Sequence, residues 1–134
     1  MAVMVIEDNP TDVFLVREAL SAHGLQVDLH VFEDGEAAIT YVQQLEQDAS
    51  LACPSLVLLD VNLPRADGFT VLRSLRGSTK CGNIPVIIMT SSHALPDRTT
   101  ASSLHADAYF QKPLSYEAFL TLGALACQLL REQT

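Results

Sequence analysis

The sequence lacks the cysteine patterns that mark disulfide-rich proteins and zinc proteins. It has three cysteines, Cys53, Cys81 and Cys127, which are widely spaced and form no CxxC pair. An odd, scattered set of this kind predicts neither a disulfide framework nor a zinc site. We therefore expect all three thiols to be ordinary packing residues, in a protein of the reducing cytoplasm.

Long hydrophobic runs and basic residues are also scarce. The longest apolar runs are far too short to span a bilayer. Residues 1–8 contain neither a basic region nor a small-residue cleavage site, so we expect no signal peptide. Lys and Arg together number 8 against 16 Asp and Glu, which gives a formal net charge of −8. This balance argues against nucleic acid and against an anionic membrane surface as partners.

The chain does contain enough apolar residues for one folded core. It has 134 residues, of which 49% are hydrophobic, and this predicts a single domain over 1–134. The most informative stretch is Leu56–Asp60, where four apolar residues run directly into a carboxylate. Without polar alternation, such a run is typical of a strand buried on both faces of a parallel sheet. Ligands bind at the carboxyl ends of such strands, so Asp60 becomes the candidate working residue.

Other apolar runs alternate with helical patterns along the whole chain. Strands are predicted over residues 1–6, 27–31, 56–60, 86–90 and 106–110. Helices are predicted over residues 10–23, 36–46, 68–75, 96–104 and 115–132. Five alternating pairs predict an α/β fold, a doubly wound three-layer sandwich around a five-stranded parallel sheet.

Four of the apolar strands end in polar groups, which are Glu7-Asp8, Asp60, Thr90 and Lys112. The carboxyl ends of parallel strands lie at one edge of a sheet, so these groups are expected to meet. Carboxylates at close range repel one another, and a hard cation such as Mg²⁺, which prefers oxygen ligands, removes the conflict. Lys112 and Thr90 add a positive charge and a hydroxyl. The set predicts a phosphoryl group held on Asp60 beside Mg²⁺.

These motifs resemble those of the two-component response regulator receiver domain, a chemotaxis-regulator-like fold, over essentially the whole chain. The matching pieces are Val5-Ile6-Glu7-Asp8-Asn9-Pro10, Leu58-Leu59-Asp60-Val61-Asn62-Leu63-Pro64, Asp67-Gly68, Thr90-Ser91-Ser92, Ala106-Asp107-Ala108-Tyr109 and Lys112-Pro113. The resemblance implies the flavodoxin-like strand order 2-1-3-4-5. It also implies a signalling module that receives a phosphoryl group from a sensor histidine kinase and is not otherwise an enzyme.

Roles at the phosphoryl group follow from the resemblance. Asp60 corresponds to the phosphoacceptor, and Thr90 and Lys112 to the residues that contact the phosphoryl group. Tyr109 matches the switch aromatic that moves inward with Thr90, which changes the surface of helix 4, strand 5 and helix 5. Lys112-Pro113 matches a peptide bond that is often cis in the family.

The metal site also follows from the resemblance. Asp8 and Asp60 correspond to carboxylate ligands of Mg²⁺, Glu7 acts on a metal-bound water, and the backbone carbonyl of Asn62 is a further ligand. Asn62 and Ser92 lie where the family tunes dephosphorylation.

A narrower resemblance is to small stand-alone receivers that pair with phytochrome-type sensor kinases. It rests on Glu7-Asp8-Asn9-Pro10, on a long segment over residues 43–54, and on His105 in place of a common glycine. His tolerates a positive φ better than most residues. We expect no output domain, because the sequence ends after the fifth helix.

The last helix has two apolar stripes. Phe119, Leu122, Ala126 and Leu129 form the expected inner face. A second apolar stripe lies beside it, so the helix has more apolar surface than a chain of this size is expected to bury. The exposed stripe suggests a homodimer that forms through the last helix, together with the edge of strand 5. Its members are Leu120, Ala124, Cys127 and Leu130. The alternatives are a single exposed patch or a chain that lost an output domain.

Two other functions use related folds. A small phosphatase that forms an aspartyl phosphate needs a second acid two residues after the nucleophile, where this chain has Asn62. A flavodoxin-like FMN binder needs a phosphate loop after the first strand, where Glu7-Asp8-Asn9-Pro10 repels phosphate. Both alternatives are less favoured than the signalling module.

Overall fold

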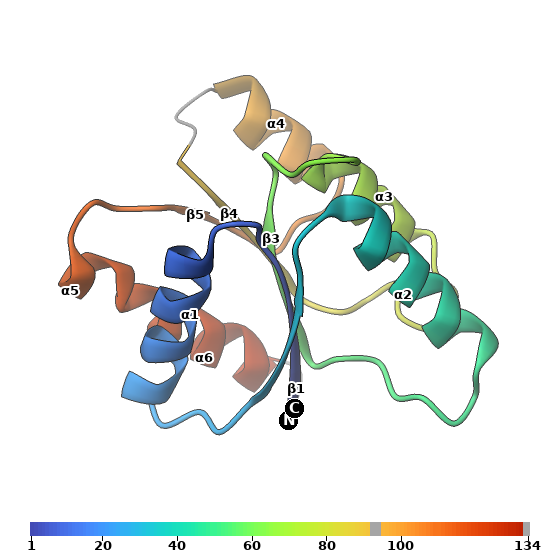
Figure 1. Ribbon diagram of the computed structural model, residues 1–134, viewed down its shortest axis with the longest axis horizontal. Coiled ribbons are helices and arrows are strands. Elements are labelled where there is room, and N and C mark those ends of the chain that lie inside the picture. Colours follow the sequence, from blue (N-terminus) through green and yellow to red (C-terminus); the bar gives the residue numbers. More distant parts are fainter. Residues whose placement is uncertain (92–94, 133–134) are drawn as a thin grey trace.

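The computed structural model describes residues 1–91 and 95–132, which form one five-stranded parallel sheet with helices on both faces (Figure 1). The strand order is β2-β1-β3-β4-β5. The strands are β1 (Ala2–Ile6), β2 (Asp28–Phe32), β3 (Leu56–Asp60), β4 (Val86–Thr90) and β5 (Ala108–Gln111). This confirms the predicted architecture and strand order.

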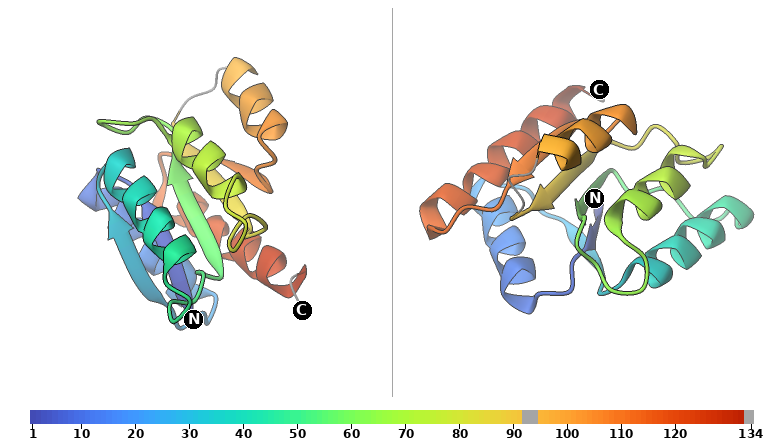
Figure 2. Two further views of the ribbon diagram at one scale, coloured as in Figure 1. Left: turned by 90° about the vertical axis from the view of Figure 1, so that its right-hand side faces the viewer. Right: turned by 90° about the horizontal axis from the view of Figure 1, so that it is seen from above.

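The helices divide between the two faces of the sheet. They are α1 (Pro10–Ala22), α2 (Gly35–Gln47), α3 (Gly68–Arg76), α4 (Leu95–Ser103), α5 (Tyr116–Phe119) and α6 (Thr121–Glu132). In Figures 1 and 2, α1, α5 and α6 lie on one face, and α2, α3 and α4 lie on the other. None of the helices in the described part of the chain is both long enough and apolar enough to cross a membrane.

The position of β3 at the centre of the sheet explains why its sequence does not alternate between apolar and polar residues. Every residue of β3 is buried. Val57 and Leu59 face the cluster under α2 and α3, whereas Leu56 and Leu58 face the cluster under α1 and α6. Both faces of the strand are therefore apolar, and its last residue, Asp60, reaches the edge of the sheet.

Side-chain caps set the helix starts that follow the strands. Asn9 Oδ1 accepts from the Thr11 N–H at 2.9 Å, and Pro10 occupies the first helical position of α1, as its sequence predicts. Asp34, Asp67 and Ser115 cap α2, α3 and α5 in the same way.

Two local expectations differ from the structure. The final helix is divided at Leu120 into α5 and α6, where the Thr121 hydroxyl donates to the Ala118 carbonyl at 2.6 Å and competes with the helical backbone. The apolar residues at 13, 14, 16 and 20 also predict that Phe14 lies on the inner face of α1, but Phe14 is 56% exposed. The inner face is set by residues 16, 19 and 20, and Phe14 lies about half a turn away from Val16.

The expectation for the cysteines was wrong for two of the three. Cys53 and Cys81 form a disulfide with a Cα–Cα distance of 5.7 Å, and Cys127 is free. The two cysteines are 28 positions apart in sequence, but each precedes one of two neighbouring parallel strands, β3 and β4. The amino-terminal ends of parallel strands lie at the same sheet edge, which brings the two loops together.

Candidate functional site

The predicted strand ends meet at the carboxyl edge of the sheet. Glu7 is 1% exposed, Asp60 is 5% exposed, and Thr90 is fully buried, whereas Asp8 is exposed. One carboxylate oxygen from each of Glu7, Asp8 and Asp60 lies within 4.8 Å of the other two. Three converging oxygen donors with one side open to solvent fit a hard divalent cation.

Lys112 places its ammonium group among these acids. Its Nζ lies 2.5 Å from Glu7 Oε1, 2.8 Å from Asp12 Oδ2 and 2.9 Å from Asp60 Oδ2. The Lys112 N–H donates to the Thr90 carbonyl at 2.8 Å, which fixes the position of the residue after β5. Burial opposes the charged ammonium, but hydrogen bonds to Asp12, Glu7 and Asp60 outweigh it and raise the pKa of Lys112.

Glu7 shows the electrostatic cost of this arrangement. Burial is the main cause that raises the pKa of Glu7 to about 7, and the nearby charge of Asp60 adds to it. The hydrogen bond and charge of Lys112 act in the opposite direction but do not cancel the effect of burial. A second cation beside Lys112 would favour the ionised form of this carboxyl group and so lower its pKa.

Asn62, in the loop after β3, contacts both Asp60 and Thr90. The Asn62 N–H donates to Asp60 Oδ1 at 3.0 Å, and Asn62 Nδ2 donates to Thr90 Oγ1 at 3.4 Å. The Gly68 N–H donates to the Val61 carbonyl at 3.0 Å. A Cβ at Gly68 would lie against the Asp60 carbonyl oxygen and 2.6 Å from Val61 Cα, so this close approach requires glycine.

Tyr109 is half-buried on β5, and the Arg98 guanidinium from α4 lies 4.8 Å from the centre of its ring. Tyr109 thus connects α4 to the strand beside the one that carries Thr90.

His105 has φ +63°, which agrees with the conformation that its position suggested. The Lys112–Pro113 peptide bond is trans, which corrects the expectation of a cis bond. Ser92 lies outside the described residues.

Asp12 is the site residue that sequence reasoning did not assign. From the sequence alone, an acid at this position predicts only a favourable charge in the first turn of α1. Its carboxylate is 18% exposed and points back to the sheet edge, where it contacts Lys112. A signal was present, because Asp12 follows Glu7-Asp8 by one helical turn on a helix whose start lies at that edge.

The second stripe of the last helix is less exposed than its sequence suggests. Leu120, Cys127 and Leu130 are half-buried and only Ala124 is exposed. The helix α6 packs beside α1, and Cys127 Sγ lies 3.9 Å from the His23 carbonyl oxygen. The neighbouring helix thus covers part of the stripe.

Comparison with known proteins identifies the class of protein to which this fold and this acidic edge belong. Residues 3–122 match the family model for the response regulator receiver domain. The chain belongs to this family and is a receiver domain of two-component signalling.

Relatives of known name support this assignment. Response regulator Rcp1 of Synechocystis is 34% identical over 110 residues, which are 82% of this chain and 75% of Rcp1. The crystal structure of Mn²⁺-bound Rcp1 matches with a TM-score of 0.83 and 30% identity, and covers 96% of this chain and 94% of that one. The phosphorylated cyanobacterial phytochrome response regulator RcpA matches with a TM-score of 0.86 and 26% identity, over 99% of this chain and 95% of that one.

Proposed function

We propose that Asp60 accepts a phosphoryl group from a sensor histidine kinase in a Mg²⁺-dependent reaction. The observation that carries this proposal is the position of Asp60. Its carboxylate ends a fully buried strand, meets Glu7 and Asp8 within 4.8 Å, and lies 2.9 Å from the Lys112 ammonium. The relatives support it, because Rcp1 is known in a Mn²⁺-bound form and RcpA in a phosphorylated form.

In this proposal each side chain has a defined task. An Asp60 carboxylate oxygen forms the bond to phosphorus as the bond from phosphorus to the kinase histidine breaks, and the electron pair returns to the imidazole. Lys112 moves its hydrogen bond from Asp60 Oδ2 to a phosphoryl oxygen, and the Thr90 hydroxyl donates to another. Asp8, Asp60 and the Asn62 carbonyl would hold Mg²⁺, with Glu7 acting on a metal-bound water, and the ion would neutralise charge at the phosphoryl oxygens.

The output follows from the residues that touch the phosphoryl group. Movement of Thr90 toward the phosphoryl group opens space beside β5, and Tyr109 turns inward to fill it. This breaks the stacking of Arg98 on Tyr109 and changes the surface formed by α4, β5 and the last helix, α5 with α6. The domain then signals through protein contacts.

The kinase, of the phytochrome-type class, docks beside the acidic edge in the cytoplasm. Phe14, on α1 one turn from Pro10, is 56% exposed, and Leu114, two residues after Lys112, is fully exposed. Large apolar side chains at such positions are typical of a protein contact surface. Phe14→Ala is expected to slow phosphotransfer from the kinase and to leave labelling by acetyl phosphate unchanged.

We also propose a homodimer through the last helix, with Leu120, Ala124, Cys127 and Leu130 at the contact and the β5 edge beside it. The support is the part of this stripe that α1 leaves uncovered, with Ala124 exposed and Leu120, Cys127 and Leu130 half-buried. Light scattering of the wild type and of Ala124→Arg, phosphorylated and not, tests it. A monomer at micromolar concentration in both states refutes the dimer.

The central experiment is labelling with acetyl phosphate and Mg²⁺, read by intact mass. The wild type gains one acid-labile phosphoryl group, Asp60→Asn gains none, and Asp8→Ala is labelled far more slowly. Asp28→Asn, an exposed acid at the opposite edge of the sheet, is the matched control and labels as the wild type does. Labelling that persists in Asp60→Asn contradicts the site, and full labelling of Asp8→Ala contradicts the metal role.

A further inference from the structure

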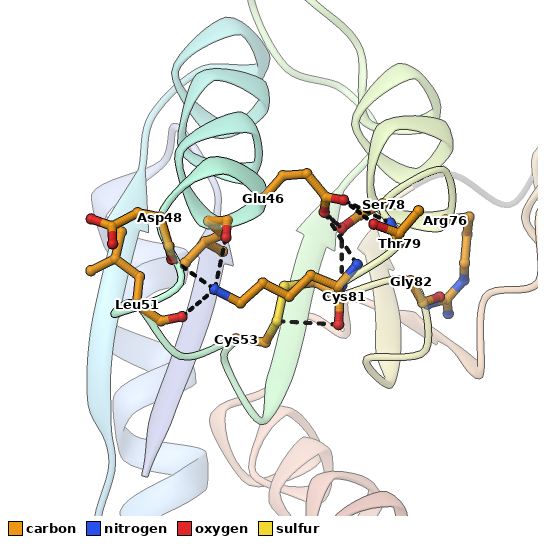
Figure 3. The surroundings of a disulfide bond; sticks show 11 residues. Glu46, Asp48, Leu51, Cys53, Arg76, Ser78, Thr79, Cys81 and Gly82 are labelled. Atoms are coloured by element: carbon orange, nitrogen blue, oxygen red, sulfur yellow. Dashed lines mark hydrogen bonds between the residues drawn. A yellow bond between two sulfur atoms is a disulfide. The ribbon is translucent and has the colours of Figure 1, made fainter.

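The disulfide between Cys53 and Cys81 lies at the sheet end opposite the acidic edge. It joins the loop between α2 and β3 to the loop between α3 and β4 (Figure 3). We propose that this pair is a reversible thiol–disulfide site that reacts with low-molecular-weight disulfides, with Cys53 as the sulfur that reacts first. The proposal is independent of phosphorylation at Asp60.

The two sulfurs differ in their access to solvent. Cys81 is 1% exposed, whereas Cys53 is half-buried in a loop whose neighbouring residues Leu51 and Ala52 are exposed. Thiol–disulfide exchange requires the attacking group to reach the sulfur itself. An external thiol or disulfide therefore meets Cys53, and Cys81 completes the exchange from inside the protein.

Contacts other than the sulfur bond hold the two loops together. Lys80 Nζ donates to the Leu45 carbonyl at 2.8 Å, to the Asp48 carbonyl at 2.9 Å and to the Leu51 carbonyl (Figure 3). These acceptors lie at and just after the carboxyl end of α2, where a positive charge is favourable. The residue next to Cys81 is thereby tied to the loop that contains Cys53.

A second set of contacts runs in the opposite direction. The Glu46 carboxylate accepts hydrogen bonds from the hydroxyls of Ser78 and Thr79 and from the N–H groups of Thr79 and Lys80. Ser78 Oγ in turn accepts from the Cys81 N–H at 2.9 Å, which fixes the backbone of that cysteine.

These contacts keep the two thiols close together in the reduced protein. Cys53 Sγ lies 3.6 Å from the Lys80 carbonyl oxygen, so a thiol at this position has an acceptor in place. The loops stay tied by Lys80 and Glu46 when the sulfur bond is broken, and the thiols stay within reach of each other. Held in this way, they close a disulfide more readily than free thiols do. Disulfides of cytosolic proteins are usually of this transient, redox-sensing kind.

The exchange balances with a low-molecular-weight disulfide as oxidant. The Cys53 thiol loses its proton and attacks one sulfur of glutathione disulfide, which releases one glutathione thiolate and leaves a mixed disulfide. The Cys81 thiolate then attacks Cys53 Sγ and releases the second glutathione. Two protein thiols are oxidised, one small disulfide is reduced, and the two protons pass to the released thiolates.

The test uses the full chain in the Cys127→Ser background, equilibrated near neutral pH in mixtures of glutathione and its disulfide and read by intact mass. The chain with both cysteines is expected to lose two hydrogens and to carry no glutathione. With Cys81→Ala it gains one stable glutathione. With Cys53→Ser the adduct on Cys81 forms about tenfold or more slowly, because this sulfur is buried. Labelling of Asp60 by acetyl phosphate checks that each variant is folded.

Three results overturn the proposal. In the first, the chain with both cysteines stays reduced in oxidising mixtures. In the second, this chain accumulates two glutathiones. In the third, the two single-cysteine variants form their glutathione adducts at equal rates. The loop contacts are tested by Lys80→Met, which is expected to lower the equilibrium constant for the internal disulfide by about tenfold. Arg73→Met, an exposed cation on α3, is the matched control. An equal constant in the two variants contradicts the role of Lys80.

Discussion

The Lys112 ammonium nitrogen lies 2.8 Å from Asp12 Oδ2, so a carboxylate on the first turn of α1 shares the cation that also contacts Asp60. This edge of the sheet gathers four carboxylates and one ammonium, which contacts three of them, those of Glu7, Asp12 and Asp60. A phosphoryl donor that approaches Asp60 therefore meets an excess of negative charge. Of the four carboxylates, the proposed chemistry gives no task to that of Asp12.

Asp12→Asn is expected to speed labelling by acetyl phosphate at saturating Mg²⁺. The substitution removes one negative charge near the donor and leaves more of the Lys112 charge for the phosphoryl group. The expected gain is about twofold to tenfold, the size of one partly screened charge interaction. Initial rates by intact mass measure it. Glu18→Gln removes an α1 acid that contacts Tyr116 instead, and serves as the control. Equal rates for the two variants rule out a special effect of Asp12.

Asp8→Asn is expected to stabilise the protein without metal and to abolish most of its stabilisation by Mg²⁺. The Asp8 carboxylate approaches Glu7 and Asp60 within 4.8 Å, and without a cation the like charges repel. Thermal unfolding in EDTA should show a rise in Tm of roughly 2–6 °C, while the wild type should gain more than the variant when Mg²⁺ is added. An Asp8→Asn variant with a lower metal-free Tm and an unchanged response to Mg²⁺ contradicts the expectation.

The residues that sequence predicted well are those whose position follows from topology. The order of apolar runs and turns places Glu7, Asp60, Thr90 and Lys112 at the ends of parallel strands, and parallel strand ends share an edge. The buried face of the last helix, from Phe119 to Leu129, follows in the same way from helical period. These inferences need only the period of each element and its place in the alternation.

The residues that sequence predicted poorly depend on where a side chain points or on which loops meet. Asp12 reaches Lys112 across 100 positions, and Cys53 meets Cys81 because β3 and β4 are neighbours. The stripe through Ala124 was interpreted as open surface, but α1 packs beside it. Periodicity within one element carries no information on a neighbouring element, so these pairings became visible only in three dimensions.

Gly68→Ala is expected to destabilise the protein and to slow phosphoryl transfer. The new methyl would overlap the Asp60 carbonyl oxygen and Val61 Cα, so the loop after β3 must move. The expected loss is about 1–3 kcal/mol in the free energy of unfolding, as for overpacked sites. Urea unfolding and acetyl phosphate labelling measure the two effects. Gly77→Ala is the control, because its Cβ would meet the Arg73 carbonyl oxygen at 3.4 Å. Equal losses in the two variants contradict the steric argument.

The stability of the reduced protein is expected to fall in acid through Glu46. Hydrogen bonds from Ser78, then from Thr79 and Lys80, lower the pKa of the Glu46 carboxyl from 4.5 to about 2. A carboxyl whose pKa is lower in the folded state stabilises it above pH 4.5, and this contribution is lost as the pH falls from 4.5 toward 2.

Urea unfolding at a series of pH values across that window measures this effect, with the disulfide kept reduced so that the two loops are held only by noncovalent contacts. Glu46→Gln should be less stable than the wild type at neutral pH, and the difference should shrink as the pH approaches 2. Glu36→Gln, an exposed acid in the first turn of the same helix, should show no such convergence. A Glu46→Gln difference that stays constant down to pH 2 would mean that the Ser78–Lys80 loop does not hold the ionised carboxylate.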